Sequence, residues 1–465
     1  MKKAKKTTAK KAAPVVAAPT PKPEKIKEKC PKGVFKHVII IEIMMLICIA
    51  ILGYILFQVI VKNNNTKESD TTTTGQVIPE VEEKKELPVF RLSLSDVTLE
   101  EFQQGSKDTK YKRNTVEFKN EGNSITFEDV ELKGRGNSTW EKPKPPFQLK
   151  FSKKVDFLGL GEAKNWVFLA NYVDYSNLRN DTAFKLAEML GEQYATRGEF
   201  VKVYVDNAYL GLYYLTHKME AKTGSVELSN KYGVLMEIDN LHRETEDCII
   251  TKYNTCMTIK DTVADEDEEA DIMNYAVNAF MKDYDKFEQA VRNKNYTQIS
   301  EIADIRSLAE YYIISEFTSN PDAYDSSFYF YKDGLNDQIH AGPIWDYDYA
   351  LSNRKWDPIA NSIIYSPYSN NVQRNYLKNS NDTNEIYLLT DMPEFMEEVK
   401  RVYQEKLKGK KDELVNWVKT RAATIKDEAL TDAERWNFED VTYAMEYLID
   451  WVSRRYDYFD YPYGE

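Results

Sequence analysis

The stretch that decides the fold is SSFYFYKDGLNDQIHAGPIW, residues 326–345. Aromatic and branched residues form two short runs, 326–332 and 339–345, and Asp333–Gly334 lies between them. Asp-Gly between two such runs is a strong local signal for a β-hairpin. The stretch therefore predicts two antiparallel strands joined by a short connection.

Acidic residues gather at the open end of this predicted hairpin. If Lys332 pairs with Ile339, the register sets Asp346 opposite Asp325. Four carboxylates then converge: Asp322, Asp325, Asp346 and Asp348. Like charges this close repel unless a cation or a proton lies between them, and oxygen ligands without His or Cys suit Mg²⁺ or Mn²⁺. The pattern predicts a divalent metal site, and solvated turn carboxylates are the plainer alternative.

The residues before the hairpin are typical of strands and turns. From 88 to about 172, β-rich runs such as SITFEDVELKGRG and NWVFLA are separated by Asn, Gly and Pro. One helix follows, with Ser176 as its expected N-cap and Gly191 as its stop. EFVKVYV and LYYLTHK then flank DNAYLG as a further hairpin. Together these segments predict an antiparallel sheet with one helix packed on it.

The second half of the chain has helical periodicity. Apolar residues recur at helical spacing in 270–292, 298–318, 393–406, 411–428 and 437–456. The body, 88–465, thus divides into a β-rich lobe, 88–240, and a mainly helical lobe, 241–465. The predicted fold class is α+β.

Several basic and small polar residues are candidates for contacting phosphate. The loop KGRGNSTW can offer Arg135, Asn137 and Ser138 to phosphate oxygens, although a plain hairpin turn has the same composition. Lys150, on the strand that returns from this loop, faces either a cleft or solvent. Arg179 lies in the first turn of the helix, where the helix dipole disfavours a cation, so it has an acidic or phosphate partner unless it is simply exposed.

The N-terminus differs in composition from the rest. Residues 1–37 hold twelve Lys and two acids, a charge of +10. Because the net charge of the whole chain is −13, the rest of the chain carries −23. Residues 38–61 are strongly apolar, with Glu42 as their one ionisable side chain, and as a helix they would cross a hydrocarbon core of about 30 Å. The preceding lysines predict a single-pass protein of the cell membrane with a cytoplasmic N-terminus, a stalk at 62–87 and an extracytoplasmic body. Topology explains the basic tail, so no nucleic-acid partner is expected.

The cysteine and histidine counts exclude several classes of protein. Four Cys in 465 residues rule out a disulfide-stapled miniprotein, and four separated His disfavour a histidine-built zinc site. No GxSxG, P-loop or GxGxxG motif occurs. Cys248 and Cys256 lie in a short strand-like stretch and can form a disulfide in an oxidising compartment; two free thiols are the alternative.

Seven motifs, in order, closely resemble the spore coat protein H (CotH) family of atypical protein kinases: LKGRGNSTW, KPPFQLKF, KNWVFLANYVDYSNLRN, YLGLYYL, LMEID, NPDAYDSSFYFYKD and AGPIWDYDYALSN. The resemblance covers roughly 88–460. It implies a two-lobed kinase-like fold, and the predicted span at 38–61 makes this chain a membrane-anchored member. Such a protein would use ATP and Mg²⁺ or Mn²⁺ to phosphorylate Ser/Thr of a protein substrate, here a surface or coat protein.

The resemblance also implies roles for individual residues. Asp322 of NPD looks like the catalytic aspartate, and Asp346 of WDYD looks like the metal-binding aspartate. Lys150 resembles the lysine that contacts the phosphates. Glu237 of MEID is expected where the lobes join, and Trp345 is expected beside the nucleotide.

Two other function classes remain open. A cell-surface pseudokinase or binding module would keep the fold without phosphotransfer. A metal-dependent glycosyltransferase would use Asp-Tyr-Asp at 346–348 to hold a nucleotide sugar, although such enzymes usually alternate strands and helices from the start. Kinase catalytic loops supply a second metal ligand five residues after the catalytic aspartate, where this chain has Ser327, so the number of metals also stays open.

Overall fold

The structure is a computed structural model that describes residues 78–79, 86–240, 247–264, 269–353 and 385–464. The basic tail, the apolar segment 38–61 and most of the predicted stalk lie outside the described residues. Within the described ranges, no helix combines the length and the apolar character that crossing a membrane requires. The predicted single-pass membrane location therefore has no support from the described helices.

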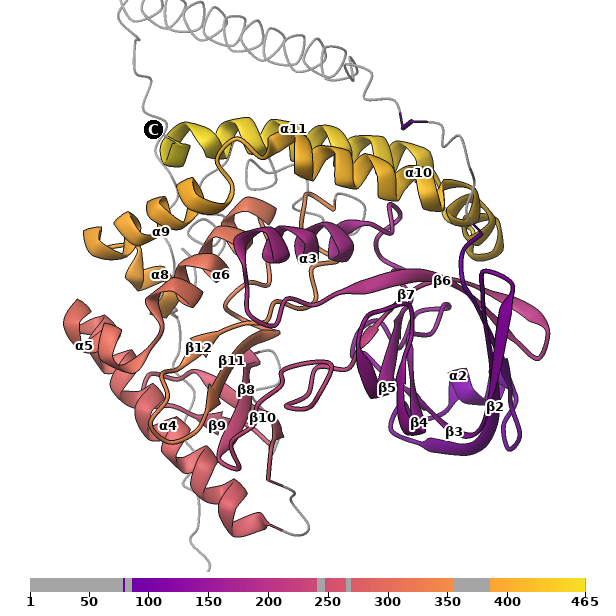
Figure 1. Cartoon of the computed structure of the whole chain (residues 1–465), viewed down its shortest axis with the longest axis horizontal. Coiled ribbons are helices and arrows are strands. Elements are labelled where there is room, and N and C mark those ends of the chain that lie inside the picture. Colours follow the sequence, from indigo (N-terminus) through magenta and orange to yellow (C-terminus); the bar gives the residue numbers. More distant parts are fainter. Residues whose placement is uncertain (1–77, 80–85, 241–246, 265–268, 354–384, 465) are drawn as a thin grey trace, which may run out of the picture. The chain divides into compact units, whose positions relative to one another are not determined.

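Seven strands close into a barrel (Figure 1). They are β1 (Val89–Ser93), β2 (Lys110–Asn120), β3 (Asn123–Gly134), β4 (Phe147–Asp156), β5 (Glu162–Leu169), β6 (Gly198–Val205) and β7 (Ala208–His217). β1 pairs with β2 in antiparallel fashion and with β6 in parallel, with Val89 opposite Lys202, and the second pairing closes the sheet. The short helix α2 (Leu99–Gln104) begins with a capping box between Thr98 and Glu101.

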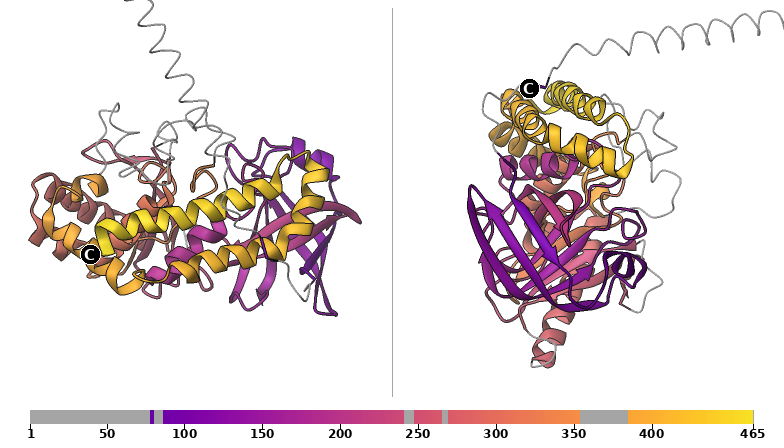
Figure 2. Two further views of the ribbon diagram at one scale, coloured as in Figure 1. Left: turned by 90° about the horizontal axis from the view of Figure 1, so that it is seen from above. Right: turned by 90° about the vertical axis from the view of Figure 1, so that its right-hand side faces the viewer.

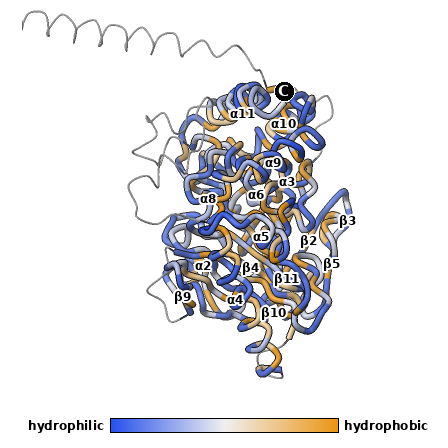
Figure 3. Tube along the Cα trace, turned by 90° about the vertical axis from the view of Figure 1, so that its left-hand side faces the viewer, coloured by the Kyte–Doolittle hydropathy of each residue, from blue (hydrophilic) through white to orange (hydrophobic). Residues whose placement is uncertain are grey.

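Alternating side chains fill the barrel interior. Phe147, Leu149 and Phe151 of β4 are buried, while the residues between them are partly or fully exposed. Hydrophobic and hydrophilic residues are interspersed along the coloured trace (Figure 3). Phe147 stacks on Phe168 of β5 with ring centroids 4.5 Å apart. The β6–β7 turn, Asp206–Asn207, has positive φ at both residues, as two-residue hairpin turns that match strand twist require.

The barrel corrects the predicted fold class. The predicted fold is an α+β, two-lobed kinase-like body after a transmembrane helix, with an antiparallel sheet in its β-rich lobe. This prediction is wrong, because the β-rich part closes into a barrel and none of the described helices could span a membrane. Closure depends on β1 meeting β6, which lies far later in the chain. Strand periodicity shows which face of a strand is apolar, but not which strand its edge will meet.

A second sheet of five strands has the order β12–β11–β8–β10–β9. Its strands are β8 (Gly233–Ile238), β9 (Ile249–Ile250), β10 (Cys256–Thr262), β11 (Phe328–Asp333) and β12 (His340–Ala341). The predicted hairpin is β11–β12, and its register is the expected one, with Tyr331 opposite His340. Because β12 ends at Ala341, the ladder stops before the acidic residues. A disulfide joins Cys248 to Cys256, with Cα atoms 5.5 Å apart.

Helices pack around this second sheet and against the barrel (Figure 1). They are α3 (Arg179–Leu190), α4 (Ala270–Arg292), α5 (Tyr296–Ile302), α6 (Ile305–Thr318), α8 (Glu385–Leu389), α9 (Pro393–Lys406), α10 (Lys411–Trp436) and α11 (Val441–Gly464). The predicted helix 298–318 is two helices, because Asp304 starts α6 by capping it. α10 and α11 run side by side, and α10 contacts both α3 and β7 (Figures 1 and 2).

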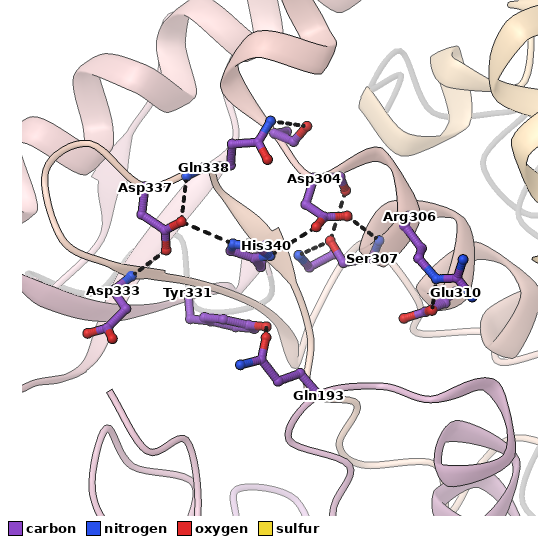
Figure 4. A network of polar contacts seen from close by, with 12 residues as sticks. Gln193, Asp304, Arg306, Ser307, Glu310, Tyr331, Asp333, Asp337, Gln338 and His340 are labelled. Carbon is purple, nitrogen blue, oxygen red and sulfur yellow. Dashed lines mark hydrogen bonds and ion pairs between the residues drawn. The ribbon is translucent and has the colours of Figure 1, made fainter. Parts of the chain in front are cut away.

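His340 ties the β11–β12 hairpin to the start of α6 (Figure 4). Its Nδ1 lies 3.5 Å from Asp304 Oδ2, and its Nε2 lies 3.4 Å from Asp337 Oδ1 in the hairpin connection. The ring also stacks on Tyr331 with centroids 4.9 Å apart. Asp304 in turn accepts the N–H of Ser307 at 2.8 Å as the N-cap of α6. The hairpin and the helix that leads toward Asp322 are therefore held to each other.

Candidate active site

A cavity of about 560 Å³ lies where the barrel, the second sheet and the segment after β12 meet. Its basic lining residues are Lys107, Lys133, Arg135, Lys218 and Lys260. Its acidic lining residues are Asp108, Glu237, Asp239, Asp322, Asp346 and Asp348. A concave site that carries both signs of charge fits a ligand that itself combines an anionic group with a bound cation.

Most of the predicted site residues line this cavity: Arg135, Asn137, Ser138, Glu237, Asp322, Trp345, Asp346 and Asp348. Asp322 reaches the cavity from the connection between α6 and β11. Asp346 and Asp348 reach it from residues 342–353, which we call the acid loop. Segments that are far apart before folding thus deliver three carboxylates to one wall.

Three predicted site residues lie outside this cavity. Lys150 is exposed on β4, beside a separate surface hollow. Arg179 is 3% exposed and forms an ion pair with Asp174. Asp325 accepts hydrogen bonds from the main-chain and side-chain N–H groups of Asn240, at 2.8 and 3.1 Å. Because the hairpin ladder ends early, the register that was extrapolated to Asp325 does not reach it.

The two carboxylates of the acid loop differ in their surroundings. Asp346 is exposed to the cavity and has a positive φ of 66°, a backbone conformation that residues with a Cβ disfavour. The enclosing protein withdraws Asp346 from bulk water and raises its pKa, which Arg135 opposes. Asp348 is 7% exposed, and burial raises its pKa well above the usual range, with further increases from Asp346, Asp174 and Asp322. The carboxylates at this wall are close enough to repel one another.

Glu237 brings a buried charge to the centre of the second sheet. Its Oε1 accepts a hydrogen bond from the Tyr329 hydroxyl, and its Oε2 accepts one from Lys260 Nζ, both at 2.9 Å. Sequence reasoning missed Lys260. This lysine is the extra residue of a β-bulge in β10, where the register with β8 shifts between Ile259 and Asp261. A bulge re-aims a side chain without leaving a sequence signal, so nothing local identified Lys260 as a cavity residue.

The loop after β3 places Arg135 beside the acid loop. The Arg135 guanidinium carbon lies 5.2 Å from the centroid of Trp345, the residue before Asp346. Gly136 has a φ of 84°, and a Cβ there would come within 2.2 Å of the side chain of Thr139, so the turn requires glycine. Lys107 Nζ donates to the Gly136 carbonyl at 3.0 Å. These contacts fix the loop that carries Arg135.

The donor atoms at the acidic wall fit a hard divalent cation. Asp346 and Asp348 offer carboxylate oxygens, and no His or Cys lines the cavity within the described ranges. Across the part of the chain that the structure describes, no group of three or more His, Cys, Asp or Glu residues is arranged to hold a metal ion unaided. Mg²⁺ typically takes one or two carboxylates and completes its octahedron with water and phosphate oxygens. Two aspartates therefore suit a metal that binds together with a phosphate ligand.

Comparison with protein-family models identifies the family of this chain. The model described as CotH kinase protein matches residues 132–459, from β3 into α11. The chain belongs to the CotH kinase protein family. Every lining residue of the cavity except Lys107 and Asp108 lies within the CotH match. No curated protein matches the chain. Membership confirms the family resemblance, but not its membrane-anchored part, and points to an atypical kinase or a spore coat protein.

Proposed function

We propose that this CotH family member is an atypical protein kinase that transfers the γ-phosphate of ATP to Ser or Thr side chains of a protein. The observation that carries the proposal is that one cavity is lined by three carboxylates, Asp322, Asp346 and Asp348, and by the basic side chains of Arg135 and Lys260. Phosphoryl transfer depends on charge neutralisation and in-line positioning rather than on covalent help from the protein. A cavity with opposed charges suits that requirement.

The proposal gives roles to four cavity residues: Asp322, Asp346, Asp348 and Arg135. Asp322 accepts the proton of the attacking hydroxyl while the hydroxyl oxygen bonds to the γ-phosphorus, the bond to the bridging oxygen breaks and ADP leaves. Asp346 and Asp348 would hold Mg²⁺ or Mn²⁺, which would neutralise phosphate charge. Arg135 donates hydrogen bonds to phosphate oxygens.

Lys260 replaces Lys150 as the lysine that contacts the phosphates. Lys150 is exposed outside the cavity, whereas Lys260 lines it and is paired with Glu237. Protein kinases use a lysine–glutamate pair to hold the nucleotide phosphates, and the pair on β10 and β8 supplies the same two groups.

The roles of Asp322 and Asp346 can be separated by measuring binding and transfer in the same samples. Full-length wild type, Asp322→Asn and Asp346→Asn are titrated calorimetrically with ATP in Mn²⁺, and transfer of ³²P from γ-labelled ATP to acceptor proteins is followed. Asp322→Asn is expected to bind Mn²⁺–ATP and to transfer phosphate about 10²–10⁴-fold more slowly, since it loses the base. Asp346→Asn is expected to lose Mn²⁺-dependent ATP binding.

Lys150→Met is the control, and it should match wild type in both assays. ATP binding by wild type without any phosphotransfer would favour the binding module. Hydrolysis of a UDP-sugar in place of ATP would favour the glycosyltransferase.

A further inference from the structure

The N-terminal end of α3 is hydrogen-bonded to the main chain of the acid loop. Arg179 Nε donates to the Ala350 carbonyl at 3.1 Å, and Arg179 Nη2 lies 3.5 Å from the Ser352 carbonyl as its donor. The same guanidinium pairs with Asp174, which also accepts the Arg179 main-chain N–H at 2.9 Å. The Arg179 guanidinium thus bonds to two main-chain carbonyls and one carboxylate of the protein, and Arg179 does not line the cavity.

The neighbouring residue holds the acid loop at a second point. Asn180 Oδ1 accepts the main-chain N–H of Tyr347 at 2.8 Å, and Tyr347 is the residue between Asp346 and Asp348. One hydrogen bond therefore joins the start of α3 to the residue that separates the two aspartates.

A third contact comes from Asn353, a residue of the acid loop itself. Asn353 Nδ2 donates to the Asp348 carbonyl at 2.8 Å and to the Val173 carbonyl at 2.9 Å. Residues 173–180 therefore contact the acid loop between its two aspartates, at Tyr347, and after them, at Ala350, Ser352 and Asn353.

The acid loop needs such external support because its backbone is unfavourable. Asp346, Leu351 and Ser352 have φ values of 66°, 52° and 54°. A side chain with a Cβ disfavours this left-handed region, so a free loop would leave it. The contacts from α3 lie at or beside these positions.

We infer that Arg179 and Asn180 are positioning residues, which hold the acid loop so that the carboxylates of Asp346 and Asp348 can reach one divalent cation together. The inference rests on the proposed role of these aspartates as metal ligands. It reassigns Arg179 from a phosphate contact to a support of the metal site. Groups that orient metal ligands typically change metal affinity 10–100-fold when they are removed.

Mn²⁺ binding without nucleotide tests the inference. Free Mn²⁺ is measured by electron paramagnetic resonance during titration of full-length wild type, Arg179→Lys, Asn180→Ala and the control Lys150→Met. Arg179→Lys keeps the charge beside Asp174 but loses the fork that spans two carbonyls, and Asn180→Ala loses the acceptor for Tyr347. Both variants should bind Mn²⁺ about 10–100-fold more weakly. Lys150→Met should bind as wild type does.

Two further readouts separate positioning from general damage. Amide hydrogen exchange at Tyr347 should speed up in Asn180→Ala without metal, while the barrel strands keep wild-type protection. In the transfer assay, both variants should show a raised apparent KM for Mn²⁺ and a kcat close to wild type at saturating Mn²⁺, which a misfolded site would not recover.

The outcomes are distinct for the inference and for the kinase proposal. Wild-type Mn²⁺ affinity in both variants overturns the inference, whether or not wild type transfers phosphate. Weakened Mn²⁺ binding in the variants, with no phosphotransfer by wild type, supports the inference and rejects the kinase function. If wild type binds no Mn²⁺ alone, the titration is repeated with ATP, because two aspartates suit a metal that binds together with phosphate. Failure to bind Mn²⁺ there too overturns both. If Arg179→Lys does not fold, the affinity of Asn180→Ala decides.

Discussion

His340 shows how a single charge links two elements near the site. It lies between Asp304 of the α6 N-cap and Asp337 of the hairpin connection, with Tyr331 stacked on its ring (Figure 4). Burial alone would lower the pKa of His340, but the hydrogen bond to Asp304 and the charges of Asp337 and Asp304 outweigh it, so the pKa is raised. The pKa of Asp304 is lowered, chiefly by its hydrogen bond to His340. The protonated histidine is therefore the form that stabilises the fold.

The raised pKa predicts a pH-dependent contribution to stability. The contribution of His340 is fully present below the unfolded-state pKa of about 6.5 and is lost as the pH rises through the folded-state pKa. His340→Gln should therefore cost about 1 kcal/mol at pH 6 and less at pH 8.5, as measured by urea unfolding. His217, whose pKa burial lowers, provides a control of opposite sign: His217→Gln should cost less at pH 6 than at pH 8.5. A cost for His340→Gln that is constant with pH would contradict this account.

Residues of the site differ in how visible they are in the sequence. Asp322, Asp346 and Asp348 could be predicted because a hairpin signal and family motifs place them at one end of β11–β12. Lys260 could not, because its approach to Glu237 depends on a bulge. A lysine on a strand near a candidate loop gives no sign of which face it will occupy.

Among the elements, the β11–β12 hairpin shows what a local sequence pattern predicts, which is the turn and the register, and what it does not predict, which is where the strand ends. Its turn and register follow from alternation and from Asp333–Gly334, and the structure confirms them. The strand ends earlier than its apolar run, so extrapolation beyond Ala341 fails. α3 likewise starts at Arg179 rather than after Ser176, because Asp174 caps the Arg179 N–H across a turn. Competing side-chain contacts set the ends of elements, and periodicity does not record them.

The β9–β10 hairpin carries a prediction at this scale. The disulfide between Cys248 and Cys256 closes a short loop at the start of β10. Cys248→Ser/Cys256→Ser should lose about 2 kcal/mol of unfolding free energy, because the unfolded chain is no longer constrained. Phosphotransfer should persist, since Lys260 is held by Glu237 on the other side of β10. Urea unfolding tests this prediction, with wild type in reductant as the matched sample; equal stability of the variant and unreduced wild type would contradict it.

At the scale of the whole molecule, the barrel and the helices are joined by buried charges. Lys144, between β3 and β4, donates to Asp432 of α10 at 2.7 Å and to the Leu212 carbonyl at 2.6 Å, and both charged side chains are fully buried. Asp432 also accepts the Leu212 N–H at 2.9 Å. No sequence pattern could pair residues this distant, just as none could pair β1 with β6.

Breaking this pair should destabilise the fold strongly. Lys144→Met leaves Asp432 buried without its cation, and the expected loss is about 3–5 kcal/mol of unfolding free energy. The double variant Lys144→Met/Asp432→Leu removes both charges and should recover much of that loss. Denaturant unfolding of both variants is the measurement. A single variant as stable as wild type would show that the pair does not join the barrel to α10.

The proposed function depends on Asp322, Asp346 and Asp348 supporting metal-dependent phosphate transfer in the cavity. Its most direct test is the rate at which the full-length chain transfers ³²P from γ-labelled ATP to protein Ser/Thr in Mn²⁺, for wild type and Asp346→Asn side by side. Wild type should transfer phosphate, and the variant should do so at least about 100-fold more slowly, because Asp346 reaches the cavity from the acid loop. Equal rates for the two proteins would contradict it.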